Sequence, residues 1–207
     1  MPIEPLLYNG LTNIAAGDLN GDGWTDLVLT QESDSYIYVL LNNQKGGWTE
    51  TKIDVVDGRA LLGPTQVLLT DLSGTGNLDI VTATEFGSAA VYLGNGTGAF
   101  TASGVLYPTG AGDSGSVIAI SDVNGDGIPD LVVTEASVGT VGIFLGVGNG
   151  TFKVPYYVGA GTSPSDILLE NLHGQASSCG FPDIVVPDLA GGIMVLLNLT
   201  ASTCPGL

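Results

Sequence analysis

The most constraining feature of this sequence is an Asp-rich loop pattern that returns about every 50 residues. Its anchors are Asp18, Asp71, Asp122 and, in a degenerate form, Asn171, with spacings of 53, 51 and 49 residues. Each anchor is followed by an Asp and a short β-branched run, such as Asp26-Leu-Val-Leu-Thr. A fixed period of this length indicates a repeat architecture in which each repeat is one supersecondary unit.

Each repeat is predicted to form four β-strands in a meander. Short apolar runs alternate with Gly/Asn turns, and no run shows helical periodicity. We expect strand A before each Asp-rich loop, strand B after it, then strands C and D. Strand D is predicted at Thr49–Val56, Thr101–Pro108 and Phe152–Val158, where its prolines suit an outer edge because proline lacks an N–H. Four-stranded units at this period predict an all-β fold, a β-propeller of four blades.

The chain is predicted to be a single domain over residues 1–207, with repeats at roughly 9–56, 57–108, 109–158 and 159–200. The fourth repeat lacks a strand D, whereas residues 1–8 contain an apolar run with a proline that resembles one. We therefore expect the N-terminal strand to complete the last blade and close the ring. The alternative is half of a larger ring, for example an eight-bladed one, formed by dimerisation.

We number the Asp-rich loops 1 to 4 by their anchors, Asp18, Asp71, Asp122 and Asn171. Loops 1 and 3 carry oxygen-bearing side chains at positions 1, 3, 5 and 9 counted from the anchor, and a backbone carbonyl is available at position 7. Hard cations such as calcium prefer oxygen ligands, and three carboxylates on nine residues repel one another without a cation. Gly21 and Gly23 are expected to supply the positive φ angles of so tight a loop. Two strong calcium sites are predicted, and a metal-free Asx-turn hairpin is the alternative. Their residues are Asp18, Asn20, Asp22, Trp24 and Asp26 in loop 1, and Asp122, Asn124, Asp126, Ile128 and Asp130 in loop 3.

Loops 2 and 4 depart from this pattern. Loop 2 keeps two carboxylates and replaces the others with neutral groups, so we predict a weaker calcium site from Asp71, Ser73, Thr75, Asn77 and Asp79. Loop 4 has His173 at position 3 and an insertion before Asp183, and it is predicted to be metal-free. A disulfide between Cys179 and Cys204 is expected to hold it, with two free thiols as the alternative.

The composition is strongly acidic, with 4 Lys+Arg against 21 Asp+Glu and a formal charge of -17. So few cations argue against a nucleic-acid backbone or an anionic membrane surface as partner. No apolar run approaches the length of a membrane span, which argues against membrane insertion. The cysteine pair, the low Lys content and the calcium loops together predict a secreted, cell-surface or periplasmic protein.

The motif Asp-x-Asn-Gly-Asp-Gly-x-x-Asp followed by Leu-Val, with Leu-Gly-x-Gly-x-Gly-x-Phe downstream, resembles the FG-GAP/VCBS repeats of integrin-α-type β-propellers. The resemblance covers essentially the whole chain. It implies calcium in the loop joining strands A and B, and a role in adhesion or ligand recognition, with some members being parts of polysaccharide-active or secreted proteins. Relatives usually have more blades, about seven, so this chain is a four-bladed ring, a dimerising half-ring or a fragment.

The B–C and D–A turns of a meander blade lie on the face opposite the Asp-rich loops. Acids near the end of strand B recur there, and they suit a cation, a basic peptide or sugar hydroxyls, or paired carboxylates for glycoside cleavage. Solvated turn residues are the alternative. The candidates on this face are Glu32, Arg59, Glu85, Asp113, Glu135 and Asp188.

The predicted function is a secreted calcium-binding module for an extracellular protein or glycan ligand. A polysaccharide-active enzyme and a structural repeat block of a larger extracellular protein are the two alternatives. Catalysis is disfavoured, because the sole histidine, His173, lies in the calcium-side insertion and the chain has only 4 Lys+Arg. A homodimer is expected if the ring needs more than four blades.

Overall fold

The computed structural model describes residues 10–31, 33, 35–55, 63–85, 87–108, 117–172 and 181–196, of which 103–108 as backbone only. Within these ranges the chain folds into fifteen β-strands. The same ranges contain no helix with the length and apolarity that crossing a membrane requires.

The strands form four antiparallel sheets in chain order. Each sheet is a meander in which consecutive strands pair, which confirms the all-β prediction. Sheet 1 holds β1 (Leu11–Gly17), β2 (Asp26–Gln31), β3 (Tyr36–Asn42) and β4 (Trp48–Asp54), and sheet 2 holds β5 (Pro64–Thr70), β6 (Asp79–Thr84), β7 (Ser88–Gly94) and β8 (Phe100–Pro108). Sheet 3 holds β9 (Ile118–Ser121), β10 (Asp130–Glu135), β11 (Thr140–Phe144) and β12 (Tyr156–Gly159), and sheet 4 holds β13 (Leu168–Glu170), β14 (Asp183–Pro187) and β15 (Ile193–Leu196).

The core lies between consecutive sheets. Strands B and C are apolar on both faces because each sheet inside the stack is covered on both sides, and β6 and β10 are buried at every position. One cluster joins sheets 1 and 2 through Val28, Val39 and Ile80, and similar clusters join sheets 2 and 3 and sheets 3 and 4. The outer strand β4 is mostly exposed.

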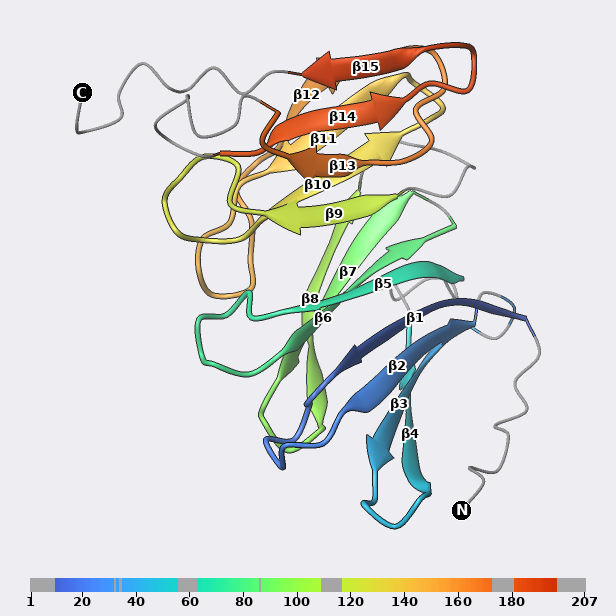
Figure 1. Ribbon diagram of the computed structural model, residues 1–207, viewed down its shortest axis with the longest axis vertical. Helices are drawn as coiled ribbons and strands as arrows, with labels where there is room; N and C mark the ends of the chain where they lie inside the picture. Colours follow the sequence, from blue (N-terminus) through green and yellow to red (C-terminus); the bar gives the residue numbers. More distant parts are fainter. Residues whose placement is uncertain are drawn as a thin grey trace.

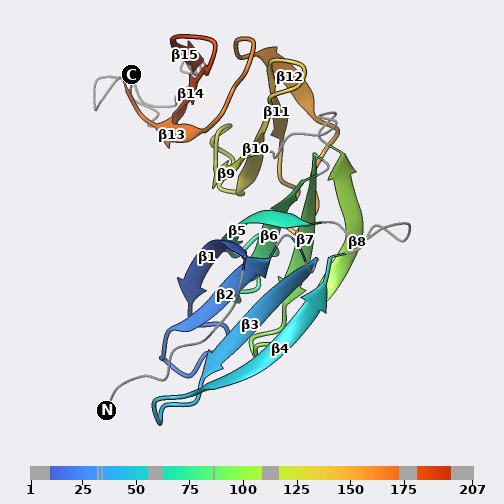
Figure 2. The same ribbon diagram turned by 90° about the vertical axis from the view of Figure 1, so that its right-hand side faces the viewer.

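The four sheets form an open arc. Their first strands contact one another in the order β1, β5, β9 and β13, and sheets 1 and 4 lie at opposite ends of the molecule (Figures 1 and 2). The closed four-bladed ring expected from the sequence is therefore not what the described residues form. The alternative of half a larger ring is compatible with this arc.

One predicted strand begins later than expected, and other predictions fall outside the described residues. The last strand D begins at Tyr156 rather than at Phe152, which makes only an isolated bridge to Gly146. Pro155 stands between them and cannot donate to a ladder. The predicted N-terminal strand in residues 1–8 and the predicted Cys179–Cys204 disulfide lie outside the described residues, as does His173.

Candidate metal centre

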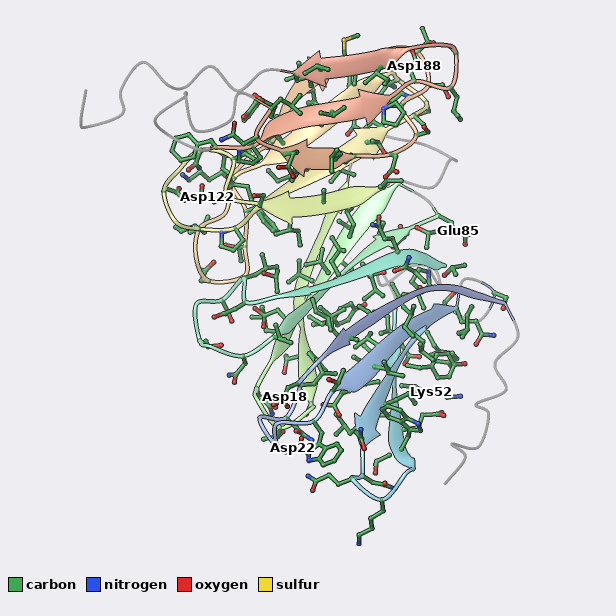
Figure 3. The ribbon with its side chains drawn as sticks, viewed as in Figure 1. Asp18, Asp22, Lys52, Glu85, Asp122 and Asp188 are labelled. Carbon is green, nitrogen blue, oxygen red and sulfur yellow. The ribbon has the colours of Figure 1, made fainter. Side chains whose placement is uncertain are left out.

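The Asp-rich loops and the B–C turns lie at opposite edges of the arc. Figure 3 shows Asp18, Asp22 and Asp122 at one edge, and Glu85 and Asp188 at the other. This separation agrees with the expected meander geometry. The loops and the opposite edge are therefore two distinct surfaces.

Loop 1 folds around the Asp18 carboxylate. Asp18 Oδ1 accepts the N–H groups of Gly21 at 2.8 Å and Asp22 at 3.2 Å, and Oδ2 accepts the N–H of Gly23 at 2.8 Å. The Asp22 N–H also donates to Asn20 Oδ1 at 3.0 Å, so the oxygens at positions 1 and 3 lie beside one donor. Gly21 and Gly23 have φ angles of 72° and 82°, as expected.

Position 5 completes this group of oxygens. Asp22 Oδ1 accepts the N–H of Trp24 at 2.8 Å, and Oδ2 accepts the amides of Gln44 at 3.0 Å and Asn20 at 3.2 Å. The Trp24 N–H and the Gln44 amide hold the pKa of the Asp22 carboxyl below its usual value. Loop 1 therefore keeps an ionised carboxylate at its exposed tip.

Loop 3 repeats this geometry. Asp122 Oδ1 accepts the N–H of Gly125 and Oδ2 that of Gly127 at 2.8 Å, while the Asp126 N–H donates to Asn124 Oδ1 at 2.8 Å. Burial raises the pKa of Asp130, and the nearby charges of Asp126 and Asp122 add to that rise. Two copies of one arrangement, 104 positions apart in the sequence, indicate a shared local function.

The aspartate at position 9 is buried in every repeat. Asp26, Asp79 and Asp130 are fully buried, and Asp183 is nearly so. In the first three repeats, one carboxylate oxygen accepts the N–H of the position-2 residue at 2.9 to 3.0 Å, and the other accepts an N–H at or just beyond the end of strand C at 2.7 to 2.8 Å. These aspartates tie the loop, strand B and strand C of one sheet together.

The sequence-based interpretation assigned position 9 to a calcium site and missed this structural role. A signal was available, because each of these acids begins a strand and is followed at once by two apolar residues. A carboxylate at such a position is buried and needs backbone donors. A carboxylate oxygen that accepts one N–H keeps a second lone pair, so metal ligation by position 9 stays a prediction.

In loop 2, hydroxyl groups form hydrogen bonds at the positions where loops 1 and 3 have Asn and Asp. Asp71 accepts the N–H groups of Thr75 at 3.0 Å and Gly76 at 2.7 Å, and the hydroxyls of Ser73 and Thr75 lie 3.1 Å apart. Asn77 donates to the Thr75 hydroxyl. Neutral groups thus replace the outer carboxylates, and the weaker calcium site stays a prediction.

The described residues of loop 4 retain the buried tie. The Leu172 N–H donates to Asp183 Oδ2 at 3.0 Å although the two residues are eleven positions apart, against seven in the other repeats. The inserted residues therefore leave the position-2 contact in place. Asn171 corresponds to position 1, as the sequence alignment predicted.

The Gly-rich C–D turns of sheets 2 and 3 fasten loops 1 and 2 to the next sheet. The Gly98 N–H donates to the Leu19 carbonyl at 3.0 Å, and the Gly150 N–H donates to the Leu72 carbonyl at 3.0 Å. Both glycines have a φ of 79°, and a Cβ at either would strike the leucine of the preceding sheet, Leu41 or Leu93. Position 2 of loops 1 and 2 thus links two neighbouring sheets.

The residues of loops 1 and 3 fit a hard cation with a mixed donor set. No three Asp, Glu, His or Cys side chains converge in the described residues. Two carboxylates and one amide oxygen, at positions 1, 3 and 5, are nevertheless grouped in each loop. Within the described ranges no basic side chain pairs with Asp18, Asp22, Asp122 or Asp126, so their charge has no protein counterion there.

The acids at the opposite edge are not equivalent to one another. Counted from the position-9 aspartate, Glu135 and Asp188 are five residues on, whereas Glu32 and Glu85 are six residues on. The positions equivalent to Glu135 are Gln31 and Thr84, both buried. The four acids therefore do not form one ring of equivalent positions. They are two pairs, and the pairs differ by one residue in their distance from the buried aspartate.

These acids hold loops of their own sheets. Glu85 Oε1 accepts the Gly63 N–H at 3.3 Å, and the Asp188 carboxylate accepts the N–H groups of Thr162, Ser163 and Ala190 at 2.9 to 3.0 Å. The Thr162 and Ala190 N–H groups lower the pKa of Asp188. Glu32, Arg59 and Asp113 lie outside the described residues.

Glu135 is the most unusual acid of this edge. It is 2% exposed, its Oε2 accepts the Thr140 hydroxyl at 2.6 Å, and its buried Oε1 has no hydrogen-bond partner within the described residues. Burial raises the pKa of its carboxyl. A raised folded-state pKa favours the protonated form, so this group stabilises the fold below its unfolded pKa and loses that contribution as pH rises through the folded pKa.

Replacing Glu135 by Gln should therefore stabilise the protein at neutral pH, by less than about 1 kcal/mol. The gain over the native chain should shrink as pH falls below the ordinary carboxyl pKa of 4.5. Thermal unfolding across pH measures this, and the same change at exposed Glu170 is the control. A neutral-pH loss of stability in Glu135→Gln would show that the charged carboxylate is needed.

The inner side of the arc carries a hollow that the sequence did not indicate. Its volume is about 400 Å³, and it lies between the first strands of sheets 2 and 3, close to sheet 4. The Gln66 side chain spans these strands, donating to the Ile118 carbonyl at 3.1 Å and accepting its N–H at 2.8 Å. Its lining includes Gln66, Leu68, Thr70, Ile118, Ile120 and Ile167.

Solved structures share this arrangement of sheets. A lectin from Agrocybe aegerita, described as recognising non-reducing terminal N-acetylglucosamine, matches with a TM-score of 0.55 and 21% identity over 89% of this chain and 51% of its own. BBS1N, solved in complex with ARL6DN, matches with a TM-score of 0.56 and 15% identity over 94% of this chain and 53% of its own. This chain therefore spans about half the length of these structures, and the likeness concerns the fold. No curated protein sequence matches the chain significantly.

The repeated loops have a family match. The FG-GAP-like repeat matches three overlapping segments, residues 18–82, 71–133 and 122–170. Each segment begins at a position-1 aspartate and extends through the following loop and strand B or, in the last segment, to the degenerate fourth loop. Together they cover most of the chain, so this protein belongs to the FG-GAP-like repeat family.

Proposed function

We propose that this chain is a calcium-stabilised binding module that acts outside the cytoplasm on a carbohydrate or protein ligand. The observation that carries the calcium assignment is the matched geometry of loops 1 and 3. In each loop the side-chain oxygens of positions 1, 3 and 5 are grouped at an exposed edge without a basic partner in the described ranges. FG-GAP repeats typically bind calcium through this loop.

The ion has a structural role in this proposal. Loop 1 is fastened to sheet 2 through Leu19, and its buried Asp26 fastens it to strand C of sheet 1. A cation at the loop tip fixes the same backbone and offsets part of the -17 charge. Extracellular modules draw on the high calcium concentration outside cells, which supports the proposed location.

The binding role is supported by the architecture. The arc presents one edge for metal loops, a separate opposite edge and an inner hollow, so ligand contacts need not disturb the ions. The structural neighbours include a lectin and a protein in complex with a protein partner. The acids of the opposite edge hold their own loops, which favours binding over catalysis.

Calcium should raise the melting temperature reversibly. At a calcium concentration about 100 times Kd, each site adds about 2.7 kcal/mol to the free energy of unfolding. Asp22→Asn and Asp126→Asn should each remove part of the calcium-dependent rise, while Asp166→Asn, an exposed acid away from the loops, should leave it intact. Calorimetric titration and thermal unfolding with calcium and with chelator measure this.

An unchanged melting temperature together with no binding heat would refute structural calcium. The ligand class is tested by screening glycan and cell-surface protein arrays with the calcium-loaded chain. Turnover of a bound polysaccharide that is lost in Glu135→Gln would instead establish the enzyme alternative. Binding without turnover supports the module.

A further inference from the structure

Gln44, in the C–D turn of sheet 1, has a backbone conformation that is unusual for its residue type. Its φ angle is 60°, and among the described residues Ser35 is the one other non-glycine residue with a positive φ. The equivalent residues of sheets 2 and 3 are Gly96 and Gly148, with φ angles of 74° and 85°. Glycine adopts this region freely, whereas a glutamine there is strained. Sheet 1 therefore keeps a strained side chain where sheets 2 and 3 have none.

The turn around Gln44 is held by neighbouring side chains. The Gln44 N–H donates to Asn42 Oδ1 at 2.9 Å, and the Gly47 N–H donates to Asn43 Oδ1 at 3.0 Å. The Asn42 N–H donates in turn to the buried Asp26 at 2.7 Å. These bonds keep Gln44 in its strained conformation. Strain that the surroundings maintain in this way is concentrated at functional positions.

The Gln44 side chain contacts the Asp-rich loop of its own sheet. Its Nε2 donates to Asp22 Oδ2 at 3.0 Å, across 22 positions of the sequence. Asp22 is the position-5 carboxylate of loop 1, and its Oδ1 accepts the Trp24 N–H within the loop. The Gln44 amide thus fixes the other oxygen from outside the loop, and the carboxylate is held on both sides.

Loop 3 lacks this contact. Among the described residues, Asp126 Oδ2 accepts only the Asn124 amide, at 3.1 Å. The glycine at the place of Gln44 has no side chain to offer. The tip of loop 3 packs against another element instead, since a Cβ at Gly125 would strike the ring of Phe181. Loops 1 and 3 therefore share their oxygen pattern but differ in what supports it, which makes loop 3 an internal control.

We propose that Gln44 is a positioning residue for a calcium ion in loop 1, an assignment that rests on the proposed calcium role. Its amide holds the Asp22 carboxylate in one orientation before the ion arrives, as outer partners of metal ligands do. A carboxylate oxygen has two lone pairs, so Oδ2 keeps one for the ion once the longer Asn20 bond, at 3.2 Å, opens. A neutral donor suits this task, because a lysine or arginine would also repel the cation.

The variant Gln44→Gly should separate calcium affinity from stability. It loses the amide, so the calcium affinity of loop 1 should fall about tenfold. It also replaces a strained residue by the one that sheets 2 and 3 use, so the melting temperature without calcium should stay level or rise. A residue that only supported the turn would lower the melting temperature when removed. A lower melting temperature with unchanged affinity therefore overturns the proposal.

The variant Gln44→Asn tests the reach of the side chain. Asparagine tolerates a positive φ and keeps the amide, but it is one methylene shorter and falls short of Asp22. Its calcium affinity should match that of Gln44→Gly. Native affinity in either variant overturns the proposal.

Calorimetric titration with calcium in two backgrounds assigns the effect to one loop. Asp126→Asn weakens loop 3, so that loop 1 is measured, and Asp22→Asn does the reverse. Gln44→Gly should weaken binding in the Asp126→Asn background and leave it unchanged in the Asp22→Asn background. An equal loss in both backgrounds would mean that Gln44 does not act through Asp22.

Terbium luminescence gives a second measurement of loop 1. Terbium occupies calcium sites made of oxygen ligands, and a nearby tryptophan sensitises its emission. The two tryptophans of the chain, Trp24 and Trp48, both belong to the first repeat, and loop 3 has Ile128 at the position of Trp24. The terbium concentration that gives half of the sensitised signal should rise about tenfold in Gln44→Gly. An unchanged concentration overturns the proposal.

The same titrations distinguish the failure of this proposal from the failure of the calcium role. If the native chain binds neither calcium nor terbium, the calcium role is refuted and the role of Gln44 with it. If the native chain binds both ions and the two Gln44 variants bind them equally well, calcium binding stands and the positioning role of Gln44 is refuted.

Discussion

Replacing Asp79 by Asn is expected to lower the free energy of unfolding by about 3 kcal/mol. The Asp79 carboxylate is fully buried and accepts three backbone N–H groups, from Leu72 and Ser73 at 2.9 Å and from Gly94 at 2.8 Å. An asparagine amide offers one acceptor oxygen and places an NH₂ group against the remaining donors. At least one buried backbone N–H then loses its partner, and the loop separates from strand C.

Urea or thermal unfolding without calcium measures this effect, so that a lost ion cannot account for it. The control is Asp166→Asn, because the Asp166 carboxylate is exposed and, among the described residues, accepts only the N–H of Ile167 at 2.8 Å. That change should stay within about 0.5 kcal/mol of the native chain. Equal stability of the Asp79 and Asp166 variants would mean that the buried aspartate does not hold the sheet.

Replacing Gly146 by Ala should cost about 2 to 3 kcal/mol. Gly146 donates its N–H to the buried Asp130 at 2.7 Å, and a Cβ there would lie 2.3 Å from the Pro129 carbonyl oxygen. The obstacle is backbone, so it cannot rotate away as a side chain can. Relief of the clash must move Gly146 and weaken the bond to Asp130.

Gly159→Ala is the matched control within sheet 3. A Cβ at Gly159 meets nothing within 4 Å, and its φ is not in the positive region, so this change should be neutral or slightly stabilising. Asn42 occupies the position of Gly146 in sheet 1 and still donates its N–H to Asp26 at 2.7 Å. A small cost in Gly146→Ala would show that sheet 3 relaxes toward the geometry of sheet 1.

Much of the fold could be predicted from the sequence because the pattern is local and repeated. The Asp-rich loops, their positive-φ glycines and the β-branched runs appear where they were expected, and the FG-GAP assignment is confirmed. The exact strand ends could not be predicted as well as the strands themselves, as the late start of β12 after Pro155 shows. Calcium binding by loops 1 and 3 stays a prediction.

The alignment of acids at the opposite edge failed for a physical reason. Side chains alternate across a strand, so a difference of one residue places Glu85 and Glu135 on different positions of the strand end. Counting from the buried aspartate would have revealed this, because Gln31, Thr84 and Glu135 are each five residues after it. The recurrence of an acid near each strand end indicated the charge of these residues but not their position along the strand.

The sequence by itself determined the unit of this protein: a four-stranded meander with an Asp-rich loop between its first two strands, repeated along the chain. That followed from short-range chemistry, since glycine conformation, carboxylate spacing and β-branched runs act within one repeat. Only the tertiary structure decided that position 9 is a buried brace and that four sheets form an open arc. Both depend on backbone N–H groups and apolar faces brought together from distant segments, and no local pattern specifies how far each sheet turns against the next.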